Sequence, residues 1–116
     1  MIVTGLVALA FGAMGVVALA QPVRVTTLLG VAAPAALLRN EVRAVYGGFG
    51  VAMAAVLLWS CEAGDLGRGV RYAVAAALGG MCAGRVAAWC VESAGPWPRV
   101  FAAVEAAGAM TLAFAD

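Results

Sequence analysis

The chain has 116 residues, of which 66% are apolar and 11% are charged, and its formal net charge is +1. A soluble globular domain has roughly 45–50% apolar and about 25% charged residues, so this composition excludes that class and indicates a protein embedded in lipid. Histidine and the phosphate-binding P-loop motif are both absent, which removes the common zinc and haem sites, nucleophile–histidine pairs and nucleotide sites. The small net charge does not indicate binding to nucleic acid. We therefore expect no enzyme, no cofactor and no bound metal.

Four apolar runs are long enough to cross a bilayer, which takes about 20 residues. They predict spanning helices over residues 1–20, 42–61, 70–91 and 98–115. Residues 21–40 are too few to span and return, and Pro22 and Pro34 break them, so we interpret them as an interfacial segment. The stretches Glu62–Gly69 and Ser93–Pro98 are predicted turns. The prediction is an all-α, integral membrane four-helix bundle, formed by a single multi-pass domain over residues 1–116.

The first apolar run has one alternative, a cleaved secretory signal peptide. Ala18-Leu19-Ala20 resembles an A-x-A cleavage site. A signal peptide also carries a basic segment before its apolar stretch, and this run has none. A spanning helix is therefore the better prediction.

Two opposite charges lie at matching depth in the last two predicted spans. Arg85 comes shortly before the end of the third, and Glu105 follows the start of the fourth, so both lie roughly 8–11 Å below one face of the bundle. A charge inside the bilayer costs roughly 2.5–3.5 kcal/mol, and such groups face the bundle interior and pair. Arginine suits a two-pronged contact with a carboxylate. We expect an Arg85–Glu105 pair that serves either as an internal clamp or as part of a ligand or proton site.

The start of the second predicted helix supplies the rest of this polar cluster. In an α-helix, Arg43, Tyr46 and Gly47 share one face while Glu41 and Gly48 share the opposite face. Glu41 and Arg43 can therefore reach one centre only if the helix starts after Glu41. Small residues on both faces predict close packing on two sides.

The third predicted helix carries a Gly80-x-x-x-Gly84 motif, which lets two helix backbones approach closely. It predicts packing within the bundle, with self-association or docking on a partner as the alternative. The three cysteines are too far apart along the predicted helices to form a disulfide. We expect free thiols at Cys61, Cys82 and Cys90.

Three separated pieces of the chain together resemble a known family. They are a Glu-x-Arg-x-x-Tyr-Gly-Gly start to the second helix, a Gly-Arg late in the third and a Glu early in the fourth, here Glu41, Arg43, Tyr46, Gly47, Gly48, Gly84, Arg85 and Glu105. The pattern resembles an uncharacterised family of small four-helix bacterial integral membrane proteins that is DoxX-like at fold level. The family often has Asp-Gly and a following Pro after the third helix, where this chain has Glu92 to Pro96. The resemblance implies the bacterial inner (cytoplasmic) membrane and brings no established reaction.

Two classes of function compete on these observations. The first is a structural or accessory subunit, packed against a larger membrane complex or another copy of itself, because the small-residue stripes suit helix packing. The second is a binding site for a small amphiphile, such as a quinone or lipid headgroup, lined by Arg43, Tyr46, Arg85 and Glu105. A DoxX-like redox role follows only from fold analogy and would need a partner's cofactor.

Overall fold

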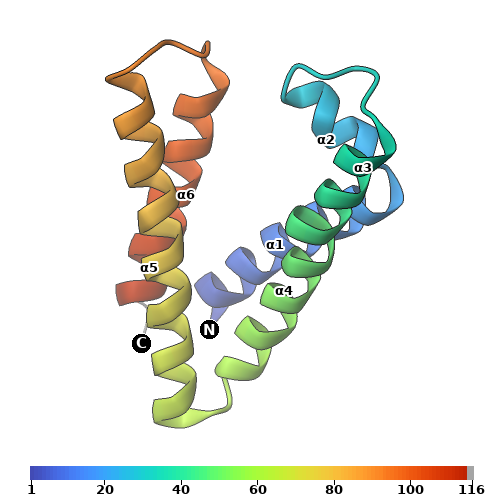
Figure 1. The fold of residues 1–116 in the computed structure, drawn as a ribbon. Coiled ribbons are helices and arrows are strands. Elements are labelled where there is room, and N and C mark those ends of the chain that lie inside the picture. Colours follow the sequence, from blue (N-terminus) through green and yellow to red (C-terminus); the bar gives the residue numbers. More distant parts are fainter. Residues whose placement is uncertain (115–116) are drawn as a thin grey trace. The chain divides into compact units, whose positions relative to one another are not determined.

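The computed structural model describes residues 1–114, and all regular structure in that range is helical. Figure 1 shows the helices in chain order: α1 (Ile2–Ala20), α2 (Pro22–Leu28), α3 (Ala36–Val42), the π-helix η1 (Arg43–Gly48), α4 (Phe49–Ser60), α5 (Gly64–Trp89) and α6 (Trp97–Phe114). Because α3, η1 and α4 follow one another without a break, the described residues form five separate helices. The all-α prediction is confirmed.

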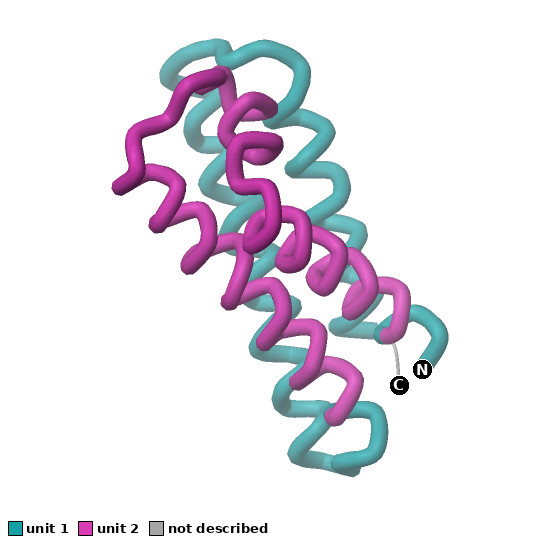
Figure 2. Tube along the Cα trace, turned by 90° about the vertical axis from the view of Figure 1, so that its right-hand side faces the viewer, with its two compact units in different colours: residues 1–4, 60–116 teal, residues 5–59 magenta. Residues whose placement is uncertain are grey.

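These helices fall into two compact units, which Figure 2 distinguishes by colour. Unit 1 contains Met1–Thr4 and the described residues from Ser60 onward, and so includes α5 and α6. Unit 2 is Gly5–Trp59, with most of α1, all of α2, α3 and η1, and nearly all of α4.

In unit 2, α1 packs against η1 and α4 through glycines. A Cβ placed on Gly15 would lie 2.7 Å from the backbone nitrogen of Val51, and one placed on Gly50 would lie 2.7 Å from the carbonyl oxygen of Phe11. Real Cβ atoms do not approach backbone so closely, so only glycine allows this contact between helix backbones. Beside it, the Phe11 ring meets the Phe49 ring edge-on, with centroids 6.4 Å apart.

Proline and glycine set the breaks inside unit 2. Pro22 lacks a backbone N–H and disfavours helical geometry at the residue before it, so α1 ends at Ala20 and α2 begins at Pro22. Gly30 has a φ of 91° and closes α2 as a Schellman motif, with Val31 N–H donating to the Thr26 carbonyl (2.7 Å). The predicted interfacial segment 21–40 therefore contains α2, a loop and the first part of α3.

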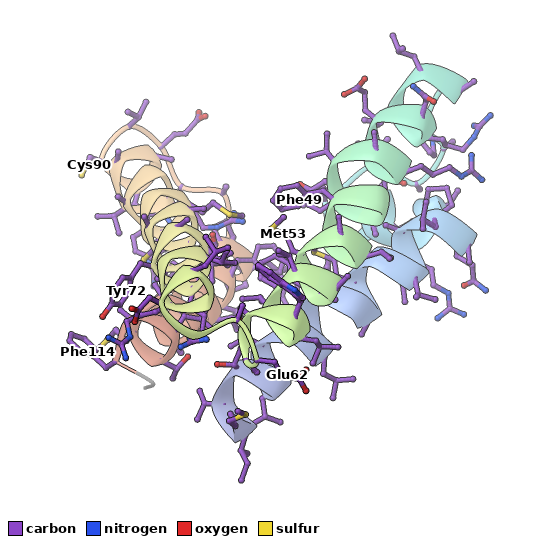
Figure 3. The ribbon with its side chains drawn as sticks, turned by 90° about the horizontal axis from the view of Figure 1, so that it is seen from below. Phe49, Met53, Glu62, Tyr72, Cys90 and Phe114 are labelled. Carbon is purple, nitrogen blue, oxygen red and sulfur yellow. The ribbon has the colours of Figure 1, made fainter. Side chains whose placement is uncertain are left out.

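In unit 1, α5 and α6 pack along each other as a helical hairpin (Figure 1). Leu78, Ala102 and Leu112 are buried, and Gly108 leaves room for the Leu78 side chain, which a Cβ there would approach to 3.1 Å. Figure 3 labels Tyr72, which lies within α5, and Cys90, which directly follows the end of that helix.

The turn before α5 is shorter than the sequence predicts, because the helix begins at Gly64 instead of near Val70. Asp65 lies in the first turn of α5, where a negative charge interacts favourably with the helix dipole. Gly67 is buried, and a Cβ there would collide with the Ser60 carbonyl. Glycine at this position therefore serves tight packing within a helix. At the other end of the unit, residue 115 of the predicted fourth span lies outside the described residues.

Two helices within residues 1–114 are long and apolar enough to cross a membrane. They are α1, with 19 residues and a mean hydropathy of 2.4, and the continuous helix Ala36–Ser60, with 25 residues and a mean hydropathy of 1.6. The helices α5 and α6 have 26 and 18 residues but are not among these two. Length and composition thus support two of the four predicted spans.

Candidate functional site

The structure brings Arg85 and Glu105 together across the α5–α6 hairpin. The Arg85 Nε donates a hydrogen bond to Oε1 of Glu105, which makes an ion pair. The Glu105 side chain is 7% exposed and that of Arg85 is 32% exposed. The second carboxylate oxygen, Oε2, is buried without a hydrogen-bond partner in the described part of the chain. The contact is therefore a single bond and not the two-pronged arrangement that the sequence suggested.

The guanidinium group of Arg85 also contacts an aromatic ring of α6. Residues four apart on a helix share a face, so Trp97, Phe101 and Glu105 lie along one side of α6. The guanidinium carbon of Arg85 lies 5.0 Å from the centroid of the Phe101 ring, and Phe101 in turn stacks on Trp97 at 6.0 Å. A cation–π contact of this kind contributes about 0.5–2 kcal/mol. Arg85 is thus positioned by both a carboxylate and a ring.

A second arginine of unit 1, Arg71, is buried with 7% of its surface exposed. Its Nη1 donates to the Ser60 carbonyl oxygen at 2.8 Å and contacts the Ser60 hydroxyl at 3.5 Å. Ser60 ends α4, and the last carbonyls of a helix lack partners within the helix. Arg71 therefore caps that end. Sequence reasoning left it outside the candidate site, although an arginine inside an apolar run was the available signal.

The predicted motif at the start of the second helix lies in unit 2 and coincides with η1. Arg43 Nε donates to the Leu19 carbonyl at 3.2 Å and so caps the end of α1. Tyr46 lines a different cavity, of about 240 Å³, together with Glu41. The α-helical pattern predicted that Tyr46 shares a face with Arg43, and this was wrong. The π-helix forms i→i+5 hydrogen bonds, and its wider turn brings Tyr46 to the side of Glu41.

A cavity open to the surface of unit 2 has a volume of about 700 Å³ and lies where α1 passes into α2. It is lined by Ala20, Gln21, Pro22, Val23, Arg24, Thr27, Arg39 and Arg43. Three of these residues are arginines and none is acidic. Only Arg43 belongs to the predicted site. The four-residue spacing of Arg39 and Arg43 on one helix was the sequence signal for a shared cationic surface.

The glycines predicted to allow close helix packing have different surroundings in the structure. Gly47 is buried, and a Cβ there would lie 2.8 Å from the Leu19 side chain. Gly48 is exposed, and the nearest atom to a Cβ there is the Arg43 carbonyl oxygen at 3.8 Å. A Cβ at Gly80 or Gly84 meets no atom of unit 1 within 4 Å. The close packing predicted for Gly80 and Gly84 is therefore not made inside the α5–α6 hairpin.

The cysteines and acidic residues form no metal site within residues 1–114. Cys61, Cys82 and Cys90 form no disulfide within the described residues. No group of three or more histidine, cysteine, aspartate or glutamate side chains in this range could hold a metal ion. The polar chemistry of the described residues thus rests on arginines and their partners.

The fold and the polar sites define an all-helical protein that has two helices of membrane-spanning length and hydropathy and a partly buried ion pair in its C-terminal hairpin. The chain belongs to the family described as a domain of unknown function (DUF4345), which matches residues 1–115. This match covers nearly the whole chain, as the sequence resemblance implied, and it shows neither a DoxX link nor the motif. No curated protein and no solved structure matches the chain.

Proposed function

We propose that this is an integral membrane protein in which α1, Ala36–Ser60, α5 and α6 all span the bilayer. The observation that carries the proposal is the inverted polarity of α6. Its one acidic residue, Glu105, is 6% exposed, whereas Val104 and Met110 are each 62% exposed. In water this arrangement would hydrate apolar side chains and bury a charge. In lipid it is favoured, because charged groups face the protein interior.

Parts of α1 and α5 show a similar arrangement. Arg71 of α5 and Thr4 of α1 are 7% and 2% exposed, while Leu6 and Leu9 of α1 are 61% and 68% exposed. A bacterial inner membrane, as the sequence resemblance implies, would cover these apolar surfaces. We include α5 in the spanning set because its charged Arg71 and Arg85 are both engaged with other residues of unit 1.

Within that membrane, the protein acts as a structural or accessory subunit that packs against a larger membrane complex or another copy of the chain. Gly80 and Gly84 support this proposal, because both are exposed and nothing in unit 1 covers them. Exposed small residues four apart on a spanning helix allow a partner helix to approach closely. The Arg85–Glu105 pair then works as the clamp that holds the α5–α6 hairpin in register.

A mild-detergent purification of the tagged chain from native membranes tests this function. We expect recovery as part of a larger assembly, and loss of that assembly in the variants Gly80→Leu and Gly84→Leu. Gly69→Leu is the matched control, since Gly69 is also exposed on α5 with no atom within 4 Å of an added Cβ. Recovery of the wild type as a lone monomer would rule out the accessory role.

A second candidate function, binding of a small amphiphile, is favoured by the arginine-lined cavity of unit 2. The residues proposed from the sequence for such a site divide between the units, because Arg43 and Tyr46 belong to unit 2 while Arg85 and Glu105 belong to unit 1. The cavity with Arg24, Arg39 and Arg43 is the better location. The DoxX-like relation stays a prediction from the sequence motif.

A further inference from the structure

We propose that the cavity lined by Arg24, Arg39 and Arg43 binds the phosphate group of an anionic phospholipid. The inference rests on the membrane location proposed above and names a ligand class for a site within unit 2. Three observations support it: the positive charge of the cavity lining, the anchoring of two of its arginines to backbone, and the position of the cavity at the end of α1.

The cavity has positive charge without a counter-charge in its lining. Arg24, Arg39 and Arg43 each carry a full charge at neutral pH, and the other polar lining side chains are the uncharged Gln21 and Thr27. The nearby carboxylate of Glu41 lines the smaller cavity instead. No acidic side chain in the lining neutralises these three guanidinium groups. Phosphate oxygens match the planar donor geometry of arginine.

Two of the arginines are held in place while most of their donors remain for a ligand. A guanidinium has five N–H donors. Arg39 donates from Nη1 to the Pro34 carbonyl at 2.6 Å, and Arg43 donates from Nε to the Leu19 carbonyl at 3.2 Å. Each contact uses one donor and anchors the side chain to backbone. Binding an anion therefore costs less side-chain entropy than it would with unanchored arginines.

The position of the cavity favours a lipid over free phosphate as the source. α1 has 19 residues without a charge and is about 28 Å long, close to the thickness of a bilayer's hydrocarbon core. The cavity lies at the end of this helix, where Ala20, Pro22 and Val23 add apolar walls. A phospholipid can place its phosphate on the arginines and its acyl chains along the apolar surface. Basic pockets at the membrane surface bind anionic headgroups in this way.

The test is native mass spectrometry on the full chain in an uncharged detergent, with phosphatidylglycerol or phosphatidylcholine added. We expect selective retention of phosphatidylglycerol. Arg24→Gln should weaken that binding about fivefold, which is the share of one arginine near an anionic headgroup. Arg24 is the informative position because its exposed side chain makes no hydrogen bond within residues 1–114, so the variant keeps the two backbone anchors. The matched control, Arg68→Gln, removes an exposed arginine from α5 and should leave binding unchanged.

Two results would overturn the proposal: equal retention of phosphatidylglycerol by the wild type and a folded triple glutamine variant at Arg24, Arg39 and Arg43, or an equal loss in Arg68→Gln. Titration with inorganic phosphate separates the two sources. Phosphate binding as tight as lipid binding, and weakened by Arg24→Gln, would retain the phosphate site and reject the lipid. Resistance to alkaline extraction from membranes reports insertion separately, so loss of lipid selectivity in an inserted protein counts against the cavity alone.

Discussion

Arg85 and Glu105 form an ion pair whose two members are unequally buried. Glu105 is 7% exposed and has one oxygen without a partner, whereas Arg85 is 32% exposed and also lies over the Phe101 ring. If Glu105 is neutralised, Arg85 keeps its ring and some access to its surroundings. If Arg85 is removed, a buried carboxylate loses its only hydrogen-bond donor within the described residues. The two halves of the pair are therefore not equivalent.

The first prediction follows from this inequality. Arg85→Ala should destabilise the protein by about 3–5 kcal/mol, the cost of leaving a buried charge unpaired. Glu105→Gln, which keeps the shape and removes the charge, should cost about 1–2 kcal/mol, since only the charge-assisted part of one hydrogen bond is lost. Unfolding of each variant in mixed detergent micelles measures the difference.

The double variant of Arg85→Ala with Glu105→Gln is the control. It should be more stable than Arg85→Ala alone, because the uncompensated carboxylate is gone. A double variant whose loss of stability equals the sum of the two single losses would show that the two residues act independently, against the pairing seen here.

The second prediction concerns the close contact of α1 and α4. Gly50→Ala should cost about 1–3 kcal/mol, because the added methyl group meets rigid backbone at Phe11 and Gly15 and the helices must separate. Gly48→Ala brings its methyl group no closer than 3.8 Å to the Arg43 carbonyl oxygen, which is an ordinary contact, and should be neutral or stabilising by up to about 1 kcal/mol, since glycine disfavours helix. Thermal unfolding of the two variants in the same detergent compares them directly, and equal melting temperatures would contradict the contact.

The third prediction tests Arg71 as a helix cap. Arg71→Gln should lower stability by about 1.5–3 kcal/mol, the range for a buried hydrogen bond from a charged group, because the charged bond from Arg71 Nη1 to the Ser60 carbonyl is lost. Arg68→Gln removes the same charge from an exposed position on the same helix and should change stability by less than about 0.5 kcal/mol. Chemical unfolding measures both. Similar losses for Arg71 and Arg68 would point to a general charge effect.

The fourth prediction distinguishes four spans from two. In a cysteine-free variant, single cysteines at Glu62→Cys and Ser93→Cys report the loops on either side of α5. If α5 crosses the bilayer, a membrane-impermeant maleimide added to intact cells labels one of the two and not the other. Labelling of both from the same side would exclude α5 as a span.

The helices themselves were largely predictable, because each long apolar run is bounded by strong local signals. Pro22 and Pro34 interrupt the helices as the sequence suggested, but the helix that continues to Ser60 begins at Ala36 and not near residue 42. The start of α5 was misplaced because Gly64, Gly67 and Gly69 are typical of turns. The prediction did not include the contact between Gly67 and the Ser60 carbonyl, which makes glycine necessary inside the helix.

The only contact of the site that could be predicted from the sequence was the one between residues at matching depth in the predicted bundle. Arg85 and Glu105 were matched from their distances to the helix ends, and the structure joins them. Tyr46 was placed on the wrong side because the π-helix at Arg43–Gly48 shifts the helical register. Arg24 and Arg39 were missed because a cavity that joins α2 to α3 depends on how the loop between them folds back.

The sequence by itself determined the helical class, the apolar runs and the breaks between them, since these depend on local composition, on proline and on charges that avoid lipid. Only the tertiary structure decided which arginine meets which partner. Arg85 pairs with a carboxylate and contacts an aromatic ring. Arg71 and Arg43 donate hydrogen bonds to carbonyls at helix ends. Arg24 lines a cavity that has no acidic side chain in its lining. A long arginine side chain reaches across several residues, so its partner depends on helix register and loop closure, which local sequence does not specify.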